Sequence, residues 1–499
     1  MRKMTAVLCA LLLCLTAVQA YADAITMTGP DTETVDRQWE TSLFFTRMQE
    51  LTGVEVSAYE AEDEEEYQKL LGRLEGGSGE VDVLFKAGLT REQEQALADS
   101  GALIDLAPLM AENMPNLTAL LDEHPEWREI ITLEDGRIVS LPLINTAERQ
   151  VMVWINAAWL DKLGVAMPTT MEELTQALLA IKAGDPNDNL DDDEIGANLL
   201  GTYEMRWLLP YFGIVADDYH LTRGEDGSVV FAPELPAYRE FIAQLAEWVR
   251  LGVLPEDAFT SSHASKNLSA QTNSSKSEKP VVSGLLVSVA PYTLENINAA
   301  MDYEPLLMAG PDGEIRWRDF LGEVWPGCYA VTSACKDPAA ALRWADALYT
   351  EAGAILGHAG VEGEDYAFND EGKWTFIVDD LRTIDSIRED VLMYTGGTMP
   401  GLTPADFLYK VNSAVDVYVM DAAAKVRAVA GRVTQPLCLS AKAQARADEL
   451  AITVGRMVEE GIGRFATGET EMTDENYEAW LASMREAGSG ELAALFEGK

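Results

Sequence analysis

Oxygen-bearing side chains recur on alternate residues in one short acidic stretch of the sequence, residues 185–194. Its six candidate cation ligands are Asp185, Asn187, Asn189, Asp191, Asp193 and Glu194. Asp191 can offer its main-chain carbonyl and Glu194 can offer two carboxylate oxygens, and Ca²⁺ takes about 6 to 8 oxygen ligands in proteins. The spacing therefore predicts a structural calcium site without a catalytic role. The alternative is a solvated acidic turn.

The elements before this stretch are expected to hold it in place. Met152 to Ile155 forms a short apolar strand pattern, and the helix that follows is interrupted at Gly164. A second helix begins after Pro168, with Thr170 as its N-cap. The acidic stretch after it resembles the D-x-[DN]-x-[DN] start of an EF-hand loop, although it lacks glycine at the sixth position and its ligand run ends early.

Residues 1–24 have the features of an export signal. A basic start precedes an apolar run from Ala6 to Val18, and small residues suit cleavage after Ala20 or Ala24. The run is shorter than the roughly 20 residues that a membrane span requires. We therefore expect an extracytoplasmic protein: secreted, periplasmic or at the cell surface. A lipid anchor at Cys14 is less favoured, because the residue before it is a bulky leucine.

The charge balance excludes several classes of partner. The chain has 83 acidic and 37 basic residues and a net charge of −46. Such a surface repels nucleic acid and anionic membranes at long range, so we expect no nucleic-acid partner, and we expect a monomer.

Three cysteines follow the predicted signal: Cys328, Cys335 and Cys438. Their spacing does not match a zinc site, and a disulfide between Cys328 and Cys335 stays open.

Strand and helix patterns alternate in the N-terminal third of the chain, which predicts an α/β fold with mainly parallel sheets covered on both faces. The length predicts two or three domain-sized units. The predicted strands lie at 25–28, 54–59, 81–85, 138–141, 281–289 and 323–332. Long helices are expected at 407–427, 440–460 and 477–496, and the polar residues 261–280 are expected to form a surface loop.

Several segments then resemble the extracytoplasmic solute-binding proteins of ABC importers, the type that includes maltose- and alginate-oligosaccharide-binding proteins. Their order along the chain makes a chance match implausible. The segments are Gly101 to Leu106 (GALIDL), Asp135 to Pro142 (DGRIVSLP), Trp154 to Glu173, Gly252 to Thr260 (GVLPEDAFT) and Gly327 to Pro338.

The resemblance implies a two-lobed fold of the periplasmic-binding-protein type (type II), with a ligand cleft between lobes joined by crossing strands. By this analogy, lobe one comprises residues 25–150 and 326–396, and lobe two comprises 151–325 and 397–499. The cleft closes on its ligand so that the importer's permease subunits can distinguish loaded from empty protein. The alginate-binding relatives also carry a calcium loop of similar pattern.

The resemblance favours an oligosaccharide ligand, which needs aromatic faces for stacking and polar groups for hydrogen bonds. The chain has 11 tryptophans, and those near predicted strand ends or crossings are the better candidates, with ordinary core packing as the alternative for each. The predicted ligand-binding residues are Trp39, Lys86, Trp154, Trp207, Tyr292, Glu323, Trp325 and Tyr394. Arg206 is a further polar candidate.

We expect no enzyme activity. Carboxylates are so abundant that a glycosidase-like pair carries no weight, and the four histidines lie in no HExxH pattern. The alternatives are a binding protein for a non-sugar polar solute, a sensory ligand-binding protein and, less favoured, a secreted glycosidase or lyase.

Overall fold

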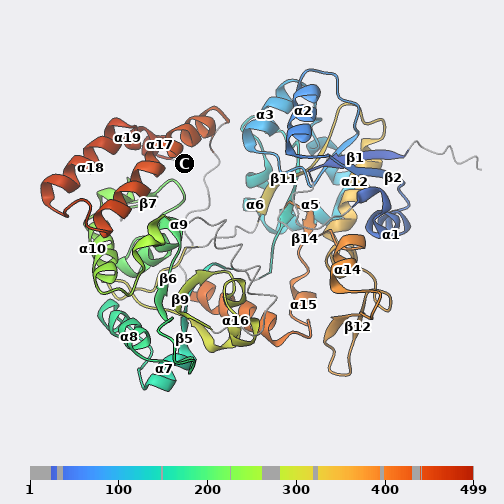
Figure 1. Ribbon diagram of the computed structural model, residues 1–499. Helices are drawn as coiled ribbons and strands as arrows, with labels where there is room; N and C mark the ends of the chain where they lie inside the picture. Colours follow the sequence, from blue (N-terminus) through green and yellow to red (C-terminus); the bar gives the residue numbers. More distant parts are fainter. Residues whose placement is uncertain are drawn as a thin grey trace, which may run out of the picture.

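In a computed structural model of the protein, two lobes lie side by side (Figure 1). The residues that the structure describes are 24–30, 38–147, 150–224, 226–260, 281–318, 324–393, 398–429, 439 and 441–497. The predicted export signal, loop 261–280 and Cys438 lie outside them. None of the helices in these residues is both long enough and apolar enough to span a membrane.

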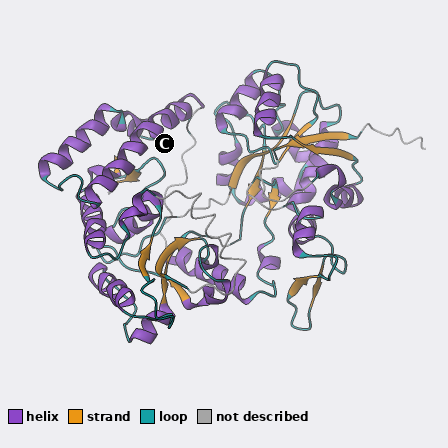
Figure 2. Cartoon of the chain, in the orientation of Figure 1, coloured by secondary structure: helices purple, strands orange, loops and turns teal. Residues whose placement is uncertain are grey.

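The first lobe is organised around a six-stranded sheet with the order β14-β4-β11-β3-β1-β2 (Figure 2). Its strands are β1 (Ile25–Gly29), β2 (Val56–Glu60), β3 (Val83–Phe85), β4 (Leu141–Ile144), β11 (Val324–Val331) and β14 (Gly401–Leu402). β2 and β3 pair with β1 in parallel, whereas β11 runs antiparallel to both β3 and β4. β14 also pairs with β4 in parallel. The sheet is therefore mainly parallel, as predicted, and its one reversed strand is β11, which enters from the other lobe.

Helices cover both faces of this sheet. They are α1 (Leu43–Thr52), α2 (Glu64–Glu75), α3 (Arg91–Asp99), α4 (Ala107–Asn113), α5 (Pro115–Glu123), α6 (Pro125–Ile131), α12 (Pro338–Asp346) and α13 (Glu351–Ala359). Successive strand residues point to opposite faces. Val83 and Phe85 accordingly join one apolar core, while Leu84 between them joins another.

A small appendage of lobe one follows α13. It contains β12 (Tyr366–Phe368), β13 (Trp374–Phe376), α14 (Ile384–Asp390) and α15 (Ala405–Leu408). The predicted helix 407–427 is in fact α15 and a separate helix, α16 (Ala414–Val429). It breaks because residues 410–412 pair with Trp374, which donates to the Lys410 carbonyl and accepts from the Asn412 amide.

The second lobe is organised around a four-stranded sheet with the order β10-β5-β9-β6. Its strands are β5 (Met152–Asn156), β6 (Ile195–Asn198), β9 (Ser283–Ser288) and β10 (Tyr303–Pro305), and β7 (Leu221–Arg223) and β8 (Val229–Phe231) form a separate hairpin. β5 pairs antiparallel with β9 and β10, and β6 pairs with β9 in parallel. Two of its three pairings are antiparallel, so the prediction of mainly parallel sheets is wrong for this sheet.

The helices of lobe two share one large apolar core that extends to the C-terminal end of the chain. They are α7 (Ala157–Leu163), α8 (Met171–Ala183), α9 (Gly201–Met205), the 3-10 segment η2 (Arg206–Phe212), α10 (Pro236–Arg250), α16, α17 (Ala441–Ala466), α18 (Asp474–Glu486) and α19 (Ser489–Leu495). Thr170 caps α8 as predicted, since its hydroxyl accepts from the Glu173 amide at 3.2 Å. α17 also contacts α3 of lobe one (Figure 1).

The chain crosses from the first sheet to the second between β4 and β5, and returns between β10 and β11. It leaves the first lobe again after β14. β14 at residues 401–402 still pairs with β4 in the first sheet. The lobe boundaries predicted above stay a prediction. Cys328 and Cys335 are both free thiols.

Candidate functional site

The acidic stretch forms a tight loop between α8 and β6. The Asp185 carboxylate accepts from the amides of Asn189 and Leu190 at 3.1 and 3.2 Å. The Asn187 side-chain oxygen accepts from the Asn189 amide at 3.1 Å, and that of Asn189 accepts from the Asp191 amide at 2.8 Å. Side-chain oxygens of alternate residues therefore accept hydrogen bonds from the backbone amides of the loop, and these bonds hold it in a tight turn.

Leu190 occupies the sixth position, where an EF-hand loop has glycine. Its φ angle is 65°, in the left-handed region, and its side chain is 90% exposed. The backbone thus makes the left-handed turn without the glycine that normally allows it. The missing glycine noted in the sequence does not prevent the turn.

Glu194 closes the loop with a buried carboxylate. The residue is 3% exposed, and neither carboxylate oxygen has a hydrogen-bond partner. Burial raises the pKa of Glu194, and the nearby charges of Asp193 and Asp185 raise it further. An unpaired buried carboxylate costs several kcal/mol or takes up a proton unless a cation pairs with it.

The amide groups of the loop face Asp193. Asn187 and Asn189 each donate to this carboxylate at 3.0 Å, and Asn187 also donates to the Val281 carbonyl at 3.1 Å. In the part of the chain that the structure describes, no three or more His, Cys, Asp or Glu side chains form a metal-binding group. The oxygens of this loop come partly from amides, which turn from donor to acceptor by rotation of the side chain. The donor set therefore fits a hard cation.

The predicted ligand-binding tryptophans are mostly core residues. Trp39 is 1% exposed against Phe45 and Phe85, Trp154 is 0% exposed and donates to the Ser288 carbonyl at 3.0 Å, and Trp207 is 2% exposed. Only Trp325, at the start of β11, keeps a partly exposed side chain among the predicted four.

The polar candidates are scattered. Lys86 is fully buried at the carboxyl end of β3 and has a φ of 52°, and Tyr292 is half-buried with its hydroxyl 3.3 Å from Asp416. Glu323 and Tyr394 lie outside the described residues.

A different cluster of side chains lies in lobe two at the end of a crossing. Arg318, the last described residue before β11, forms an ion pair with Asp218 at 2.8 Å. Arg206 lies 3.9 Å from the other oxygen of Asp218, and its guanidinium lies over the Tyr203 ring at 5.2 Å. The Arg318 guanidinium lies over the Trp207 ring, also at 5.2 Å. Trp207 and Arg206 were predicted; Asp218, Arg318 and Tyr203 were missed.

Two further titratable groups, the buried His220 and the partly buried Asp217, lie behind this cluster. Burial lowers the pKa of His220 well below its usual range, and Arg206 and Arg318 lower it further, so the ring is neutral. His220 Nδ1 lies 3.4 Å from Arg206. Burial raises the pKa of Asp217 to about 6, although this carboxylate accepts from the Tyr219 and Leu221 amides at 2.9 and 2.8 Å.

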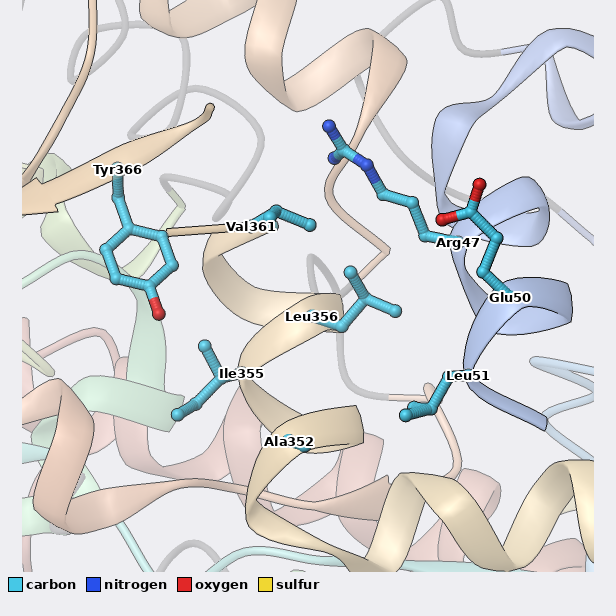
Figure 3. Close-up of a pocket in the computed structure, with 9 residues that line it drawn as sticks. Arg47, Glu50, Leu51, Ala352, Ile355, Leu356, Val361 and Tyr366 are labelled. Atoms are coloured by element: carbon cyan, nitrogen blue, oxygen red, sulfur yellow. The ribbon is translucent and has the colours of Figure 1, made fainter. Parts of the chain in front are cut away.

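A pocket of about 430 Å³ lies within lobe one, between α1 and α13 (Figure 3). Leu51, Ile355 and Leu356 form its apolar wall, and Arg47 stands at its rim. Arg47 is held by Asp365 at 2.6 Å, and Asp365 is fully buried. The lining residues all belong to lobe one, and the pairing of Arg47 with Asp365 supports the fold.

Comparison with known proteins begins with a family model. Residues 32–217 match the model described as bacterial extracellular solute-binding protein. The fructooligosaccharide ABC transporter substrate-binding protein FusA of Streptococcus pneumoniae serotype 4 is 29% identical over 338 residues, 65% of this chain. The match spans 60% of the length of FusA.

Solved structures agree over nearly the whole chain. FusA of S. pneumoniae in complex with kestose has a TM-score of 0.72 at 20% identity, covering 95% of this chain and 97% of that one. An extracellular solute-binding protein from Bifidobacterium longum subsp. infantis has a TM-score of 0.78 at 18% identity, covering 95% and 96%. A FusA structure described as an EF-hand mutant, with fructo-nystose, has a TM-score of 0.71 at 20% identity, covering 95% and 97%.

These matches are to binding proteins and not to enzymes. The resemblance predicted from the sequence is therefore confirmed: the chain is similar to bacterial extracellular solute-binding proteins and has their two-lobed α/β fold.

Proposed function

We propose that this protein is the extracytoplasmic solute-binding component of an ABC importer and that it binds an oligosaccharide between its lobes. The observation that carries the proposal is the two-lobed fold shared over 95% of the chain with FusA in complex with kestose. The 29% identity to a fructooligosaccharide-binding protein supports a sugar ligand. Permease subunits are the expected partners, and the N-terminal signal would deliver the protein outside the cytoplasm.

Among the predicted ligand residues, Trp325 is the strongest aromatic candidate. It is partly exposed and lies where the chain enters β11 from lobe two. A pyranose or furanose ring packs its less polar face on such an aromatic surface. Three of the predicted ligand residues are buried in this structure: Trp39, Lys86 and Trp154. Their role would be to support the sheets behind the ligand. Tyr292, Glu323 and Tyr394 stay candidates near the crossings.

A panel of oligosaccharides and other solutes tests this function. Thermal shift should show stabilisation by one neutral or acidic sugar class, and isothermal titration calorimetry should then give one site per chain. Stabilisation by peptides or polyamines with no response to any sugar would replace the oligosaccharide by another polar solute. Release of reducing ends from the bound sugar would instead indicate a glycosidase.

The loop at 185–194 is proposed to bind calcium in a structural role. Asp185, Asn187, Asn189, Asp191, Asp193 and Glu194 would supply the oxygens, and the unpaired carboxylate of Glu194 is the observation that supports it. Bound Ca²⁺ would supply positive charge to this buried site and would fix the loop against the segment that leads into β9, through Asn187 and the Val281 carbonyl. Scanning calorimetry with calcium and with EGTA tests this, and an equal melting temperature in both would refute it.

A further inference from the structure

The ion pair between Asp218 and Arg318 lies where the chain leaves lobe two for β11 of lobe one. Arg318 is the last described residue of lobe two before the crossing, and Trp325 lies seven residues later on the first sheet. In a two-lobed protein the crossing segments form the floor between the lobes. Arg318 and Trp325 therefore lie at the two ends of one crossing, the first in lobe two and the second in lobe one.

The ion pair is partly exposed to solvent, and aromatic rings pack against its arginine. The Asp218 side chain is 59% exposed and that of Arg318 is 14% exposed. Trp207 lies under the Arg318 guanidinium and stacks on Trp317, with 6.1 Å between the ring centroids. Trp317 in turn donates to the Val151 carbonyl at 2.8 Å. The aromatic rings hold Arg318 in one orientation, while the Asp218 carboxylate keeps exposed oxygen for other partners.

The charges of the cluster balance. The two arginines Arg206 and Arg318 stand beside the two carboxylates of Asp217 and Asp218, and the buried His220 ring is neutral. A balanced pair offers donors and acceptors to sugar hydroxyls, which are both donors and acceptors themselves. A uronate carboxylate would meet Asp218 as a like charge and would find Arg318 already paired.

We propose that Asp218 and Arg318, together with Tyr203, form a polar contact surface that selects neutral oligosaccharides over acidic ones. This inference rests on the proposed function and names its substrate class. The Asp218 carboxylate accepts from ring hydroxyls, the Arg318 guanidinium donates to them, and the half-buried Tyr203 ring provides an apolar flank. Specificity then comes from the negative member of the pair, which would repel the charge of an acidic sugar.

The test compares wild-type protein with Asp218→Asn by calorimetric titration. Kestose and lacto-N-tetraose serve as neutral probes, and an alginate trisaccharide serves as the acidic probe. Wild type should bind a neutral probe in preference to the acidic one. Asp218→Asn removes one negative charge and leaves Arg318 uncompensated, so its affinity for the neutral sugar should fall about tenfold or more while its affinity for the alginate trisaccharide rises.

Asp474→Asn is the matched control, because Asp474 also pairs with an arginine, Arg239 at 2.6 Å, but lies on α18 and is 94% exposed. It should bind every probe as wild type does. Equal binding by Asp218→Asn and Asp474→Asn would overturn the inference and leave the proposed function intact, and so would a wild-type preference for the acidic sugar. A wild-type protein that binds no sugar of either class would instead remove the proposed function, and this inference with it.

Discussion

Two charged regions of lobe two differ in how their charges are compensated. In the loop at 185–194, the Glu194 carboxylate is buried and both oxygens lack a partner. In the cluster around Asp218, each acidic group faces an arginine or backbone amides, and the Asp218 side chain is 59% exposed. The loop holds a buried carboxylate without a partner, whereas the carboxylates of the cluster are paired and its buried atom without a partner is Arg206 Nε.

The difference indicates what each region is built to bind. A buried negative charge without a partner is destabilising by itself, so the loop gains from a cation that neutralises it. A balanced pair at a partly exposed position gains little from an added ion but can exchange hydrogen bonds with hydroxyl groups. One region would therefore stabilise lobe two, and the other would contact the ligand.

The largest effect is expected from removing the aromatic support of the cluster. Trp207→Ala should lower the free energy of unfolding by about 3–5 kcal/mol, because it leaves a cavity beside Trp317 and under Arg318. Urea denaturation would measure it. Trp325→Ala is the matched control, since the partly exposed Trp325 should cost much less stability while weakening sugar binding. Equal destabilisation by both variants would show that Trp325 is also core.

Glu194→Gln should remove the response of stability to calcium. At calcium about 100 times its Kd, wild type should gain about 2.7 kcal/mol, and the variant should gain nothing. Without calcium the variant should be at least as stable as wild type, because it lacks the unpaired buried charge. Glu295→Gln is the control: Glu295 is 4% exposed but accepts from the Ser283 amide at 3.1 Å. It should keep the calcium response, and losing that response would contradict the assignment to Glu194.

The calcium response should also depend on pH. The pKa of Glu194 is raised in the calcium-free fold, so protonation favours this fold. The resulting stability is fully present below the unfolded pKa of about 4.3 and is lost as pH rises through the folded pKa. Calcium binds the ionised form, so the calcium-induced rise in melting temperature should be larger at pH 7.5 than at pH 5. An equal rise at both values would argue against Glu194 as a ligand.

The smallest effect is expected at the outer side of the loop. The Lys162 ammonium lies 2.6 Å from the Pro186 carbonyl and 2.6 Å from Asp188, but the two side chains are 39% and 79% exposed. Lys162→Met should therefore cost about 0–1 kcal/mol and leave the calcium response in place. Loss of calcium binding in this variant would show that the loop depends on its outer contact as well as on Glu194.

The loop could be predicted from the sequence because its candidate ligands lie within ten consecutive residues, and local turns bring them together. The cluster could not be predicted in full. Asp218 and Arg318 are 100 residues apart in the sequence, and tertiary packing, including that of Trp207 on Trp317, brings them into contact. Trp207 was predicted as a ligand residue for its type and its position after the acidic loop, and Arg206 was predicted as a polar companion; neither was predicted with its partners.

Local patterns predicted several elements well, and β1 and α8 lie where their residues predict. Burial of the tryptophans did not follow from position near strand ends, because an indole fills a core as readily as a ligand site. The reversed direction of β11 also escaped prediction. Antiparallel pairing of β11 depends on a chain that returns from the other lobe, which no local pattern records.

β11 has a consequence for the order in which the protein can fold. It lies between β3 and β4 and is the strand that joins β1, β2 and β3 to β4 and β14, yet it begins only at Val324. During synthesis, β1 to β3 and β4 therefore cannot form one sheet until β11 has been made, after most of the second lobe. Such long-range closure is slow, and the delay suits a chain whose N-terminal signal predicts transport before folding is finished.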